Sequence, residues 1–246
     1  MSAFTKKIES IINDQEHGST KVLQDICQLF LYQKYDLDEL RWAFIKLRKI
    51  NPSMVVIHHF LNELQTKLDL NFKNHVIQYI DKWQYCEERI ASYIFKLLPQ
   101  TPLTILTHSY SGVVIKVLVL LKSKGVCFNV LQTESTPGGE GKLQAEALVR
   151  LKLKIDLIAD KKIAHKFPGI DVCLLGVDQY NHRGFVNKIG SQAIVDLTKE
   201  YTTPLYTIGD SRKQVTHIQP ESIKGLFEYV SYNQQIKLIN ENGTYS

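Results

Sequence analysis

The stretch LTILTHSYSG, residues 103–112, decides the fold class of this chain. Apolar and β-branched residues are followed at once by polar ones and a glycine, a pattern typical of a buried strand that ends in a loop. Similar runs recur along the second half of the chain, and helix-length amphipathic segments separate them. This alternation predicts a doubly wound, mainly parallel α/β sheet. We expect strands over residues 103–107, 128–133, 154–158, 171–176 and 204–208, and crossover helices over 113–124, 142–151 and 188–201.

The first hundred residues have a different pattern, with apolar residues at intervals of three and four and almost no turn-forming residues. Such spacing predicts amphipathic helices. The sequence therefore predicts a helical domain over residues 1–98, followed by a Rossmann-like α/β domain over residues 99–246. The expected helices are residues 4–12, 20–32, 37–47, 53–64 and 72–98.

The composition excludes several classes of protein. With 246 residues, 44% of them hydrophobic, 22% charged and only 13 Gly and 7 Pro, the chain is neither disordered nor fibrous. No apolar run approaches the roughly 18 residues of a membrane span, and no secretory segment is recognisable at the start, so we expect a cytoplasmic protein without a membrane partner.

The net charge of +5 is spread along the chain without a block of like charges. It is only weak evidence for nucleic acid, and we expect no direct binding of nucleic acid. The charge fits a phosphorylated small molecule or an acidic protein partner equally well. The four cysteines form no C-x-x-C pair, so they predict buried thiols, with neither a metal site nor a disulfide. The cysteines are Cys27, Cys86, Cys127 and Cys173. No cofactor is predicted.

Polar residues follow each expected strand, and in open parallel sheets ligands bind outside the carboxyl ends of the strands. A pocket at this edge is therefore expected, although polar loops also occur there in α/β proteins without a ligand. The residues concerned are those of 107–112, 133–139, 159–161, 176–178 and 209–211.

The residues at this edge do not match three well-known types of functional site. The run 137–142 is similar to a phosphate-binding P-loop, but Thr136 stands where the first glycine is required and Leu143 where a Ser or Thr is required. No G-x-G-x-x-G follows the first strand, which argues against a dinucleotide site. A serine hydrolase built on Ser109, His108 and Asp178 lacks the G-x-S-x-G elbow.

Individual polar residues have both a structural and a functional interpretation. His108 is a hydrogen-bonding residue at a strand end or a ligand-binding one, and Asp178 caps a loop or acts on a ligand. Asn187 and Lys188 are expected to open the helix that runs to residue 201. Backbone amides at a helix N-terminus attract anions, so this position is either a phosphate site or a solvated charge.

The motifs of the second half resemble the initiation factor 2B family. That family groups regulatory subunits of the translation factor with methylthioribose-1-phosphate isomerase and ribose-1,5-bisphosphate isomerase. The order and spacing of the motifs are the family's, and similarity extends weakly to Gly18-Ser19 and to 51–53. The matching runs are residues 105–109, 133–137 with Gly141, 175–178 and 184–191.

The resemblance implies a helical domain, a Rossmann-like domain, a phosphosugar-sized pocket between them, and a homodimer or larger homo-oligomer. It assigns the catalytic positions to Ser109 and Asp178. The ligand-binding positions that it implies are Gly18, Ser19, His108, Glu134, Asn187 and Lys188. In the isomerases a Cys and an Asp move protons between C1 and C2 of an opened aldose phosphate.

This chain departs from the isomerase pattern, because Ser109 stands in the Cys position. A thiol loses its proton near pH 8.5, whereas an alcohol is a far poorer acid and base. Three positions at which the isomerases carry Arg, a bidentate phosphate ligand, are occupied here by His17, Asn51 and Thr136. The sequence thus favours a binding or regulatory protein for a phosphorylated metabolite or nucleotide, and leaves an aldose-ketose phosphate isomerase as the alternative.

Overall fold

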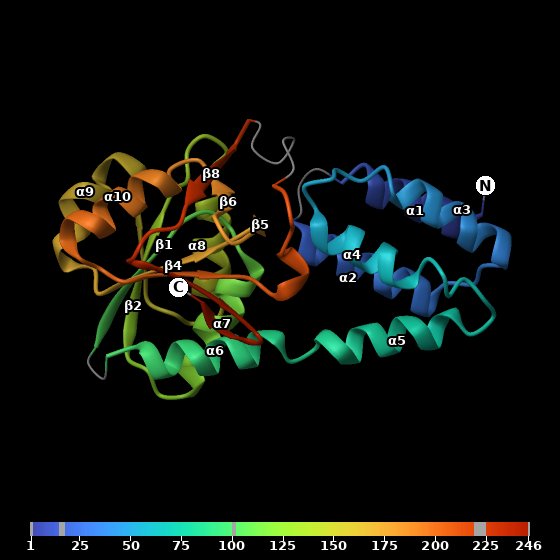
Figure 1. Ribbon diagram of the computed structural model, residues 1–246, viewed down its shortest axis with the longest axis horizontal. Helices are drawn as coiled ribbons and strands as arrows, with labels where there is room; N and C mark the ends of the chain where they lie inside the picture. Colours follow the sequence, from blue (N-terminus) through green and yellow to red (C-terminus); the bar gives the residue numbers. More distant parts are fainter. Residues whose placement is uncertain (1, 15–17, 100–101, 219–224, 246) are drawn as a thin grey trace. The chain divides into compact units, whose positions relative to one another are not determined.

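The computed structural model describes residues 2–14, 18–99, 102–218 and 225–245. Contacts between residues divide the chain into two compact units, Met1–Gln84 and Tyr85–Ser246. The first unit is helical and the second is built around a mainly parallel sheet (Figure 1). The predicted α/β class with a helical first part is confirmed. The division falls at residue 84, whereas the sequence placed the domain boundary at residue 98.

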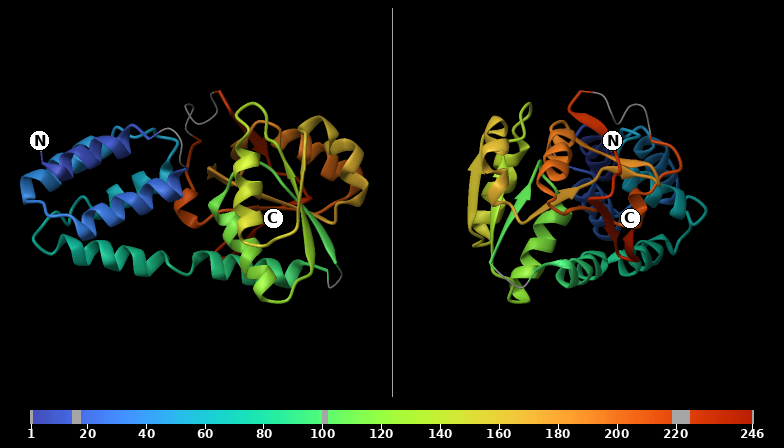
Figure 2. Two further views of the ribbon diagram at one scale, coloured as in Figure 1. Left: turned by 180° about the vertical axis from the view of Figure 1, so that it is seen from behind. Right: turned by 60° about the vertical axis from the view of Figure 1, so that its left-hand side comes forward.

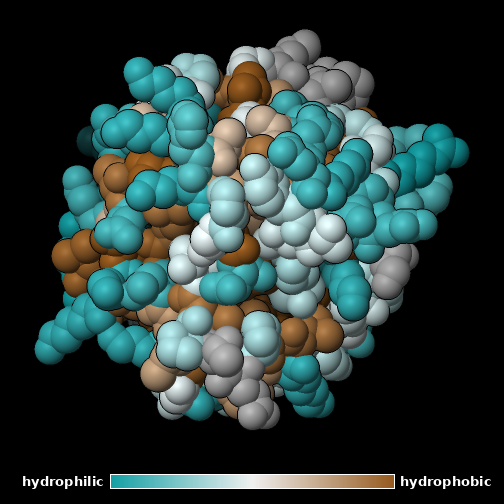
Figure 3. Space-filling model, turned by 90° about the vertical axis from the view of Figure 1, so that its left-hand side faces the viewer, coloured by the Kyte–Doolittle hydropathy of each residue, from teal (hydrophilic) through white to brown (hydrophobic). Residues whose placement is uncertain are grey.

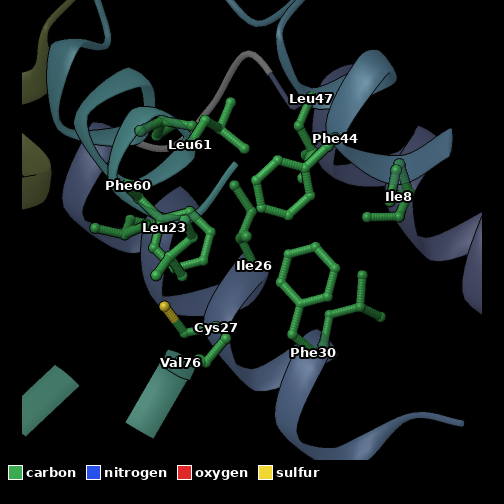
Figure 4. Packing of buried hydrophobic residues seen from close by; sticks show 14 of the residues in the cluster. Ile8, Leu23, Ile26, Cys27, Phe30, Phe44, Leu47, Phe60, Leu61 and Val76 are labelled. Atoms are coloured by element: carbon green, nitrogen blue, oxygen red, sulfur yellow. The ribbon is translucent and has the colours of Figure 1, made fainter. Parts of the chain in front are cut away.

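The first unit packs its helices around a core of aromatic and aliphatic side chains (Figure 4). The ring of Phe72 stands edge-on to those of Phe30 and Phe44, with centroids 5.1 and 5.5 Å apart. Asp36 caps the third helix in a capping box with Glu39. Within the described residues the helices of this unit are α1 (Ala3–Ile12), α2 (Ser19–Tyr32), α3 (Leu37–Leu47), α4 (Val55–Leu64) and α5 (Phe72–Trp83).

The single helix predicted over residues 72–98 is wrong, because the structure divides it into α5 and α6 (Cys86–Leu97). The apolar residues of this segment are divided between two hydrophobic cores. Val76 is buried in the core of the first unit, whereas Ile90 and Ile94 are buried against the sheet of the second. The helical spacing of apolar residues continues from α5 into α6, so the sequence pattern alone could not reveal the break between these helices.

The second unit contains a seven-stranded sheet in the order β10-β9-β7-β4-β1-β2-β3, parallel except for the pairing of β10 with β9. The expected strands are all present. Its strands are β1 (Leu103–Thr107), β2 (Phe128–Thr133), β3 (Ile155–Ile158), β4 (Val172–Gly176), β7 (Leu205–Ile208), β9 (Ile236–Asn240) and β10 (Gly243–Tyr245).

Helices cover both faces of this sheet (Figure 2). Successive side chains of each central strand point to opposite faces. Ile105 packs in the cluster that includes residues of α6 and of α7 (Gly112–Ser123), and Leu148 of α8 (Glu140–Arg150) belongs to the same cluster. Leu106, the next residue along, packs in the cluster that includes residues of α9 (Ile163–Lys166) and α10 (Ser191–Tyr201). The sheet is therefore doubly wound.

A small antiparallel sheet, β5-β6-β8, accompanies the large one. Its strands are β5 (Gln179–Tyr180), β6 (Gly184–Lys188) and β8 (Phe227–Ser231). The prediction that Asn187 and Lys188 open a helix is wrong, because both lie in β6, where they pair with Glu228 and Phe227. The helix begins three residues later, at Ser191.

The surface of the molecule is mixed in character. Figure 3 shows one face, on which hydrophilic side chains predominate and hydrophobic ones form smaller patches between them. Leu143, Val149 and Leu157 are exposed hydrophobic residues on α8 and on the edge strand β3. Among the helices of the described ranges, none has both the length and the apolar character that crossing a lipid bilayer requires.

Candidate functional site

The topology of the large sheet reverses between β1 and β4. From β1 the chain proceeds to β2 and β3 on one side, and from β4 to β7 and β9 on the other. The loops that follow β1 and β4 therefore diverge, and such a switch point is where open α/β sheets bind ligands. Ser109 and Asp178 follow these two neighbouring strands, so both lie at the carboxyl edge of the sheet, next to the switch point.

His108 is held by both of its ring nitrogens. Nε2 lies 2.9 Å from the carbonyl oxygen of Ile189, and Nδ1 lies 2.7 Å from the hydroxyl oxygen of Thr133. Because a carbonyl only accepts, Nε2 carries the proton and Nδ1 accepts from Thr133. Burial lowers the pKa of His108 below its ordinary value, so the ring is neutral at pH 7. His108 connects strand ends and is not available as a base for Ser109.

The backbone of Ser109 is fixed by a buried polar network. Its φ of +66° places it in the left-handed region, its N–H donates to the hydroxyl of Ser135 at 2.7 Å, and its carbonyl accepts from Gln132 Nε2 at 3.1 Å. Gln144 Nε2 in turn donates to Gln132 Oε1 at 2.7 Å. These bonds hold the residue without engaging its hydroxyl. Among the described residues, no hydrogen-bonded base is positioned to take the hydroxyl proton of Ser109.

Asp178 follows β4 and carries a carboxyl group that is shifted toward its neutral form. Burial raises the pKa of Asp178, and the positive charge of Lys213 opposes that rise. The side chain of Lys213 is only 6% exposed, and its ammonium donates to the carbonyl oxygen of Val177 at 2.6 Å. A neutral carboxyl group can donate a hydrogen bond or a proton to a ligand.

The loop after β2 is tied to the next loop of the sheet by Asp160. Burial favours the neutral form of this carboxyl group, but hydrogen bonds from the amides of Thr136 and Ser135, at 2.7 and 2.9 Å, outweigh it and lower the pKa of Asp160. A Cβ atom on Gly141 would lie 1.8 Å from the carbonyl oxygen of Thr133, so only glycine fits there. Glu134, a predicted ligand-binding residue, directs its carboxylate to Lys142, with an Oε1–Nζ distance of 3.6 Å.

Asn187 and Lys188 bring their side chains to two different places. Asn187 Nδ2 donates to the hydroxyl of Ser191 at 3.0 Å, at the start of α10. The ammonium of Lys188 donates to Glu140 Oε1 at 2.8 Å, at the start of α8. Lys188 therefore joins the small sheet to the loop after β2.

The N-terminus of α10 is already occupied by a carboxylate of this chain. Glu228 Oε1 accepts hydrogen bonds from the amides of Gly190 at 2.9 Å and Gln192 at 2.8 Å. The sequence placed a helix N-terminus at Asn187 and Lys188 and left open whether it is a phosphate site or a solvated charge; two observations bear on this expectation. The helix begins elsewhere, and Glu228 supplies the negative charge that its amides attract.

Two predicted residues, Gly18 and Ser19, lie in the helical unit, where Gly18 is the N-cap and Ser19 the first residue of α2. His17 lies outside the described residues. Asn51, also in the helical unit, accepts the amide of Ser53 at 2.9 Å through Oδ1. The predicted residues that follow strands of the large sheet, His108, Ser109, Glu134 and Asp178, therefore lie at one edge of it, whereas Asn187 and Lys188 lie in β6 of the small sheet. Gly18 and Ser19 are described only within their own unit.

Two cavities lie away from the predicted residues. One, of about 350 Å³, is lined by residues of α1 and α2, and the other, of about 510 Å³, lies at the amino ends of β1, β2 and β3 beside Lys122, Lys152 and Lys154. Within the described ranges, no three His, Cys, Asp or Glu side chains are grouped so that they could hold a metal ion. The prediction that all four cysteines are buried is wrong for Cys127, which is exposed in the second cavity.

Comparison with known protein families places most of the chain in one of them. A family model described as the initiation factor 2 subunit family matches residues 6–228. The chain belongs to this family. The resemblance inferred from the motifs of the second half is thereby confirmed, and it extends through most of the helical unit.

Relatives within the family include both initiation factor-like proteins and isomerases. An eIF-2B subunit 2-like protein of Pyrococcus furiosus is 26% identical over 216 residues, which cover 85% of this chain and 78% of that protein. Ribose 1,5-bisphosphate isomerase of Methanocaldococcus jannaschii is 31% identical over 123 residues, which cover 50% of this chain and 39% of the isomerase. Membership of the family therefore does not decide between binding and catalysis.

Solved structures of family members share the fold. Translation initiation factor eIF-2B of Pyrococcus horikoshii matches with a TM-score of 0.85 at 20% identity, over 100% of this chain and 97% of that one. A chain of the tetrameric eIF2B-beta2-delta2 complex of C. thermophilum matches with a TM-score of 0.74 at 15% identity, over 100% and 92%. Relatives of this chain thus form oligomeric complexes.

Sequence reasoning missed four charged residues at this edge of the α/β unit. Glu140 and Lys213 lie in the glycine-containing segments that follow β2 and β7, and that position could have drawn attention to them. Asp160 lies in one of the polar runs noted after the strands, but its two amide partners could not be foreseen. Glu228 carried no signal, since it becomes relevant only through the pairing of β8 with β6.

Proposed function

We propose that this member of the initiation factor 2 subunit family is a binding and regulatory protein that holds a phosphorylated sugar or nucleotide without converting it. The observation that carries the proposal is Ser109 at the switch point. Its hydroxyl has no hydrogen-bonded base among the described residues, and the neighbouring His108 uses both ring nitrogens elsewhere. Proton transfer by an alcohol requires such a base.

The class of ligand is supported by the groups that gather at the same edge. Burial raises the pKa of Asp178 and so favours the protonated form, which can donate a hydrogen bond, and the amide of Asn187 and the ammonium of Lys188, paired with Glu140, add polar groups. The net charge of +5 favours the approach of an anion. A sugar or nucleoside monophosphate combines the hydroxyls and the charge that these groups recognise.

The proposal is tested by thermal stabilisation with ribose 5-phosphate and adenosine monophosphate. A ligand that binds only the folded state raises the melting temperature as its concentration exceeds Kd. We expect stabilisation that Asp178→Asn weakens and that the control Asp156→Asn, on the exposed part of β3, leaves unchanged. Absence of stabilisation by every phosphorylated compound would contradict the proposal.

A second function, aldose-ketose phosphate isomerase, is favoured by one observation. Asp178 keeps the position that the isomerases use, and its raised pKa suits an acid that protonates a sugar oxygen. Incubation with 5-methylthioribose 1-phosphate and ribose 1,5-bisphosphate, followed by NMR, distinguishes the two functions. We expect no ketose product; conversion that Ser109→Ala abolishes would establish the isomerase.

Self-association forms part of the proposal. Relatives occur in oligomeric complexes, and this chain exposes Leu143 (54%), Val149 (59%) and Leu157 (43%) on α8 and on the edge strand β3. An unpaired edge strand and exposed apolar residues are typical of surfaces that bind another protein. We expect a homodimer or a larger homo-oligomer in analytical ultracentrifugation. A monomer at all micromolar concentrations would contradict the proposed self-association. The exposed apolar residues would then be a surface for a different protein partner.

A further inference from the structure

The cavity of about 510 Å³ lies at the amino ends of β1, β2 and β3, at the edge of the sheet opposite to the candidate site. Its volume falls in the range of small-molecule sites, roughly 300 to 1,000 Å³. Two turns line it, one between α7 and β2 and one between α8 and β3. In the first turn the amide of Gly125 donates to the carbonyl oxygen of Lys122 at 3.0 Å, and that of Val126 to Leu121 at 3.1 Å. This is a Schellman motif, and Gly125, with a φ of +84°, occupies its left-handed position.

The second turn has the same motif, but a lysine occupies its left-handed position. The amides of Lys152 and Leu153 donate to the carbonyl oxygens of Val149 and Leu148, at 2.8 and 3.1 Å. The φ of Lys152 is +59°, a conformation in which a Cβ atom crowds the backbone and which glycine adopts without that strain. The turn thus holds a lysine side chain at the cavity where glycine would fit the backbone better.

Three ammonium groups line the cavity, and none of its described lining residues is acidic. The ammonium of Lys122 donates to the carbonyl oxygen of Lys152, which ties the two turns together, and neither Lys152 nor Lys154 forms an ion pair with a described residue. Two features offset part of this charge. The carboxylate of Asp171 accepts the amide of Thr104 at 2.7 Å, and the C-termini of α7 and α8 each carry about half a negative charge. Positive charge remains in excess, so the cavity attracts anions.

Apolar side chains and one thiol complete the lining. Pro102, Val126 and Phe128 contribute apolar surface beside the lysines, and the thiol of Cys127 is exposed there. An inorganic anion would engage the ammonium groups alone. An organic anion with an apolar body would engage both parts of the lining, as ligands of mixed character do in small-molecule sites.

We propose that this cavity is a second ligand site of the chain and binds a small organic anion of the aromatic carboxylate class. The carboxylates of the ligand pair with Lys152 and Lys154, and its apolar body covers Val126 and Phe128. The site is separate from that of the proposed function, because the two lie at opposite ends of the strands of one sheet.

The first test compares two aromatic disulfides, the dianion dithiobis(nitrobenzoate) and the neutral dithiodipyridine. The thiolate of Cys127 attacks either reagent, a mixed disulfide forms, and the other half of the reagent leaves as a thiolate. The other three cysteines are buried, so the rate reports on Cys127. We expect the ratio of the anionic to the neutral rate constant to exceed that of N-acetylcysteine amide about tenfold. A ratio equal to that of this free thiol would overturn the proposal.

Lysine variants separate the cavity from the general field of the protein. We expect Lys152→Gln and Lys154→Gln each to lower the rate ratio about threefold, because each removes a positive charge from the lining. The control Lys124→Gln removes the same charge from the C-cap of α7, which does not line the cavity, and should leave the ratio nearly unchanged. An equal loss in the control would indicate a nonspecific basic surface and overturn the proposal.

Lys152→Gly separates binding of an anion from a role in the turn. Glycine relieves the left-handed strain, so we expect the melting temperature to rise by about 2 to 4 °C while the rate ratio falls as in Lys152→Gln. A lower melting temperature with an unchanged ratio would assign Lys152 to the turn alone and overturn its role in the site.

Terephthalate, a dicarboxylate that cannot react with a thiol, tests the class of ligand. We expect it to slow the modification of Cys127 by both reagents, and the neutral terephthalamide to have no effect. Equal protection by inorganic phosphate would overturn the organic class of the ligand, and no protection by terephthalate would overturn the site. Neither result changes the stabilisation by ribose 5-phosphate that tests the proposed function.

Discussion

Replacement of Glu228 by Ala tests whether a carboxylate from a distant strand holds the start of α10. Glu228 Oε1 accepts two amide hydrogen bonds, from Gly190 at 2.9 Å and from Gln192 at 2.8 Å, and the N-cap Gly190 has no side chain of its own. Hydrogen bonds to a charged group each contribute about 1.5 to 3 kcal/mol when partly buried. The helix dipole adds about 0.3 to 1 kcal/mol.

We therefore expect Glu228→Ala to lower the free energy of unfolding of the α/β unit by about 2 to 4 kcal/mol, because both amides share the one oxygen atom Oε1 and together contribute less than two separate bonds. For a unit of this size, such a loss lowers Tm by about 4 to 16 °C. Glu228→Gln keeps an acceptor oxygen and loses the charge, so we expect an intermediate effect.

The assay must report on the α/β unit alone. Both tryptophans, Trp42 and Trp83, lie in the helical unit, so their fluorescence follows the other half of the chain. Calorimetry and hydrogen exchange of the peptide 188–201 follow α10 directly. Glu200→Ala, at the exposed far end of the same helix, is the matched control. A loss below about 0.5 kcal/mol, or equal exchange in Glu228→Ala and the control, would refute the role of Glu228 as a cap.

Three further predictions concern the site and its surroundings. Burial lowers the pKa of His108, so its contribution to stability is present above about pH 6.5 and is lost as the pH falls through its folded-state pKa. When the free energy of unfolding is measured in urea at several pH values between 5 and 8, it should change less with pH in His108→Asn than in the wild type. An equal change with pH in both proteins would contradict this. Gly141→Ala places a Cβ atom 1.8 Å from a backbone oxygen and should cost more than about 2 kcal/mol, whereas Gly112→Ala meets nothing within 4 Å and should cost less than about 0.5 kcal/mol. Cys127 is exposed and the other thiols are buried, so one thiol per native chain should react rapidly with a disulfide reagent; rapid reaction of two or more would show that the cores open.

The strands of the large sheet could be predicted because their signal is local. Residues 103–107 and 128–133 were expected as strands, and β1 and β2 have the same bounds. Alternate burial on two faces requires apolar residues at nearly every position, and the polar residue that follows marks the end of each strand. The same logic placed Ser109 and Asp178 at one edge of the sheet, because parallel strands carry their carboxyl ends to the same side.

The break between α5 and α6 and the position of Lys188 could not be predicted from local patterns. One helical stripe can serve two cores when its halves pack on different partners. The run 184–188 becomes a strand because β8 pairs with it, and that partner is distant in the sequence. Long-range pairing overrides local propensity where the backbone groups of both segments are hydrogen-bonded together.

The sequence by itself determined which chemical groups are present: an alcohol at residue 109, a carboxyl group at residue 178, and an amine at residue 188. Only the tertiary structure decided the states of these groups. It paired the ammonium of Lys188 with Glu140, engaged both ring nitrogens of His108, and placed the carboxylate of Glu228 at the N-terminus of α10. Hydrogen bonds and charge interactions depend on distances of a few ångströms through space, and the order of residues along the chain does not set those distances.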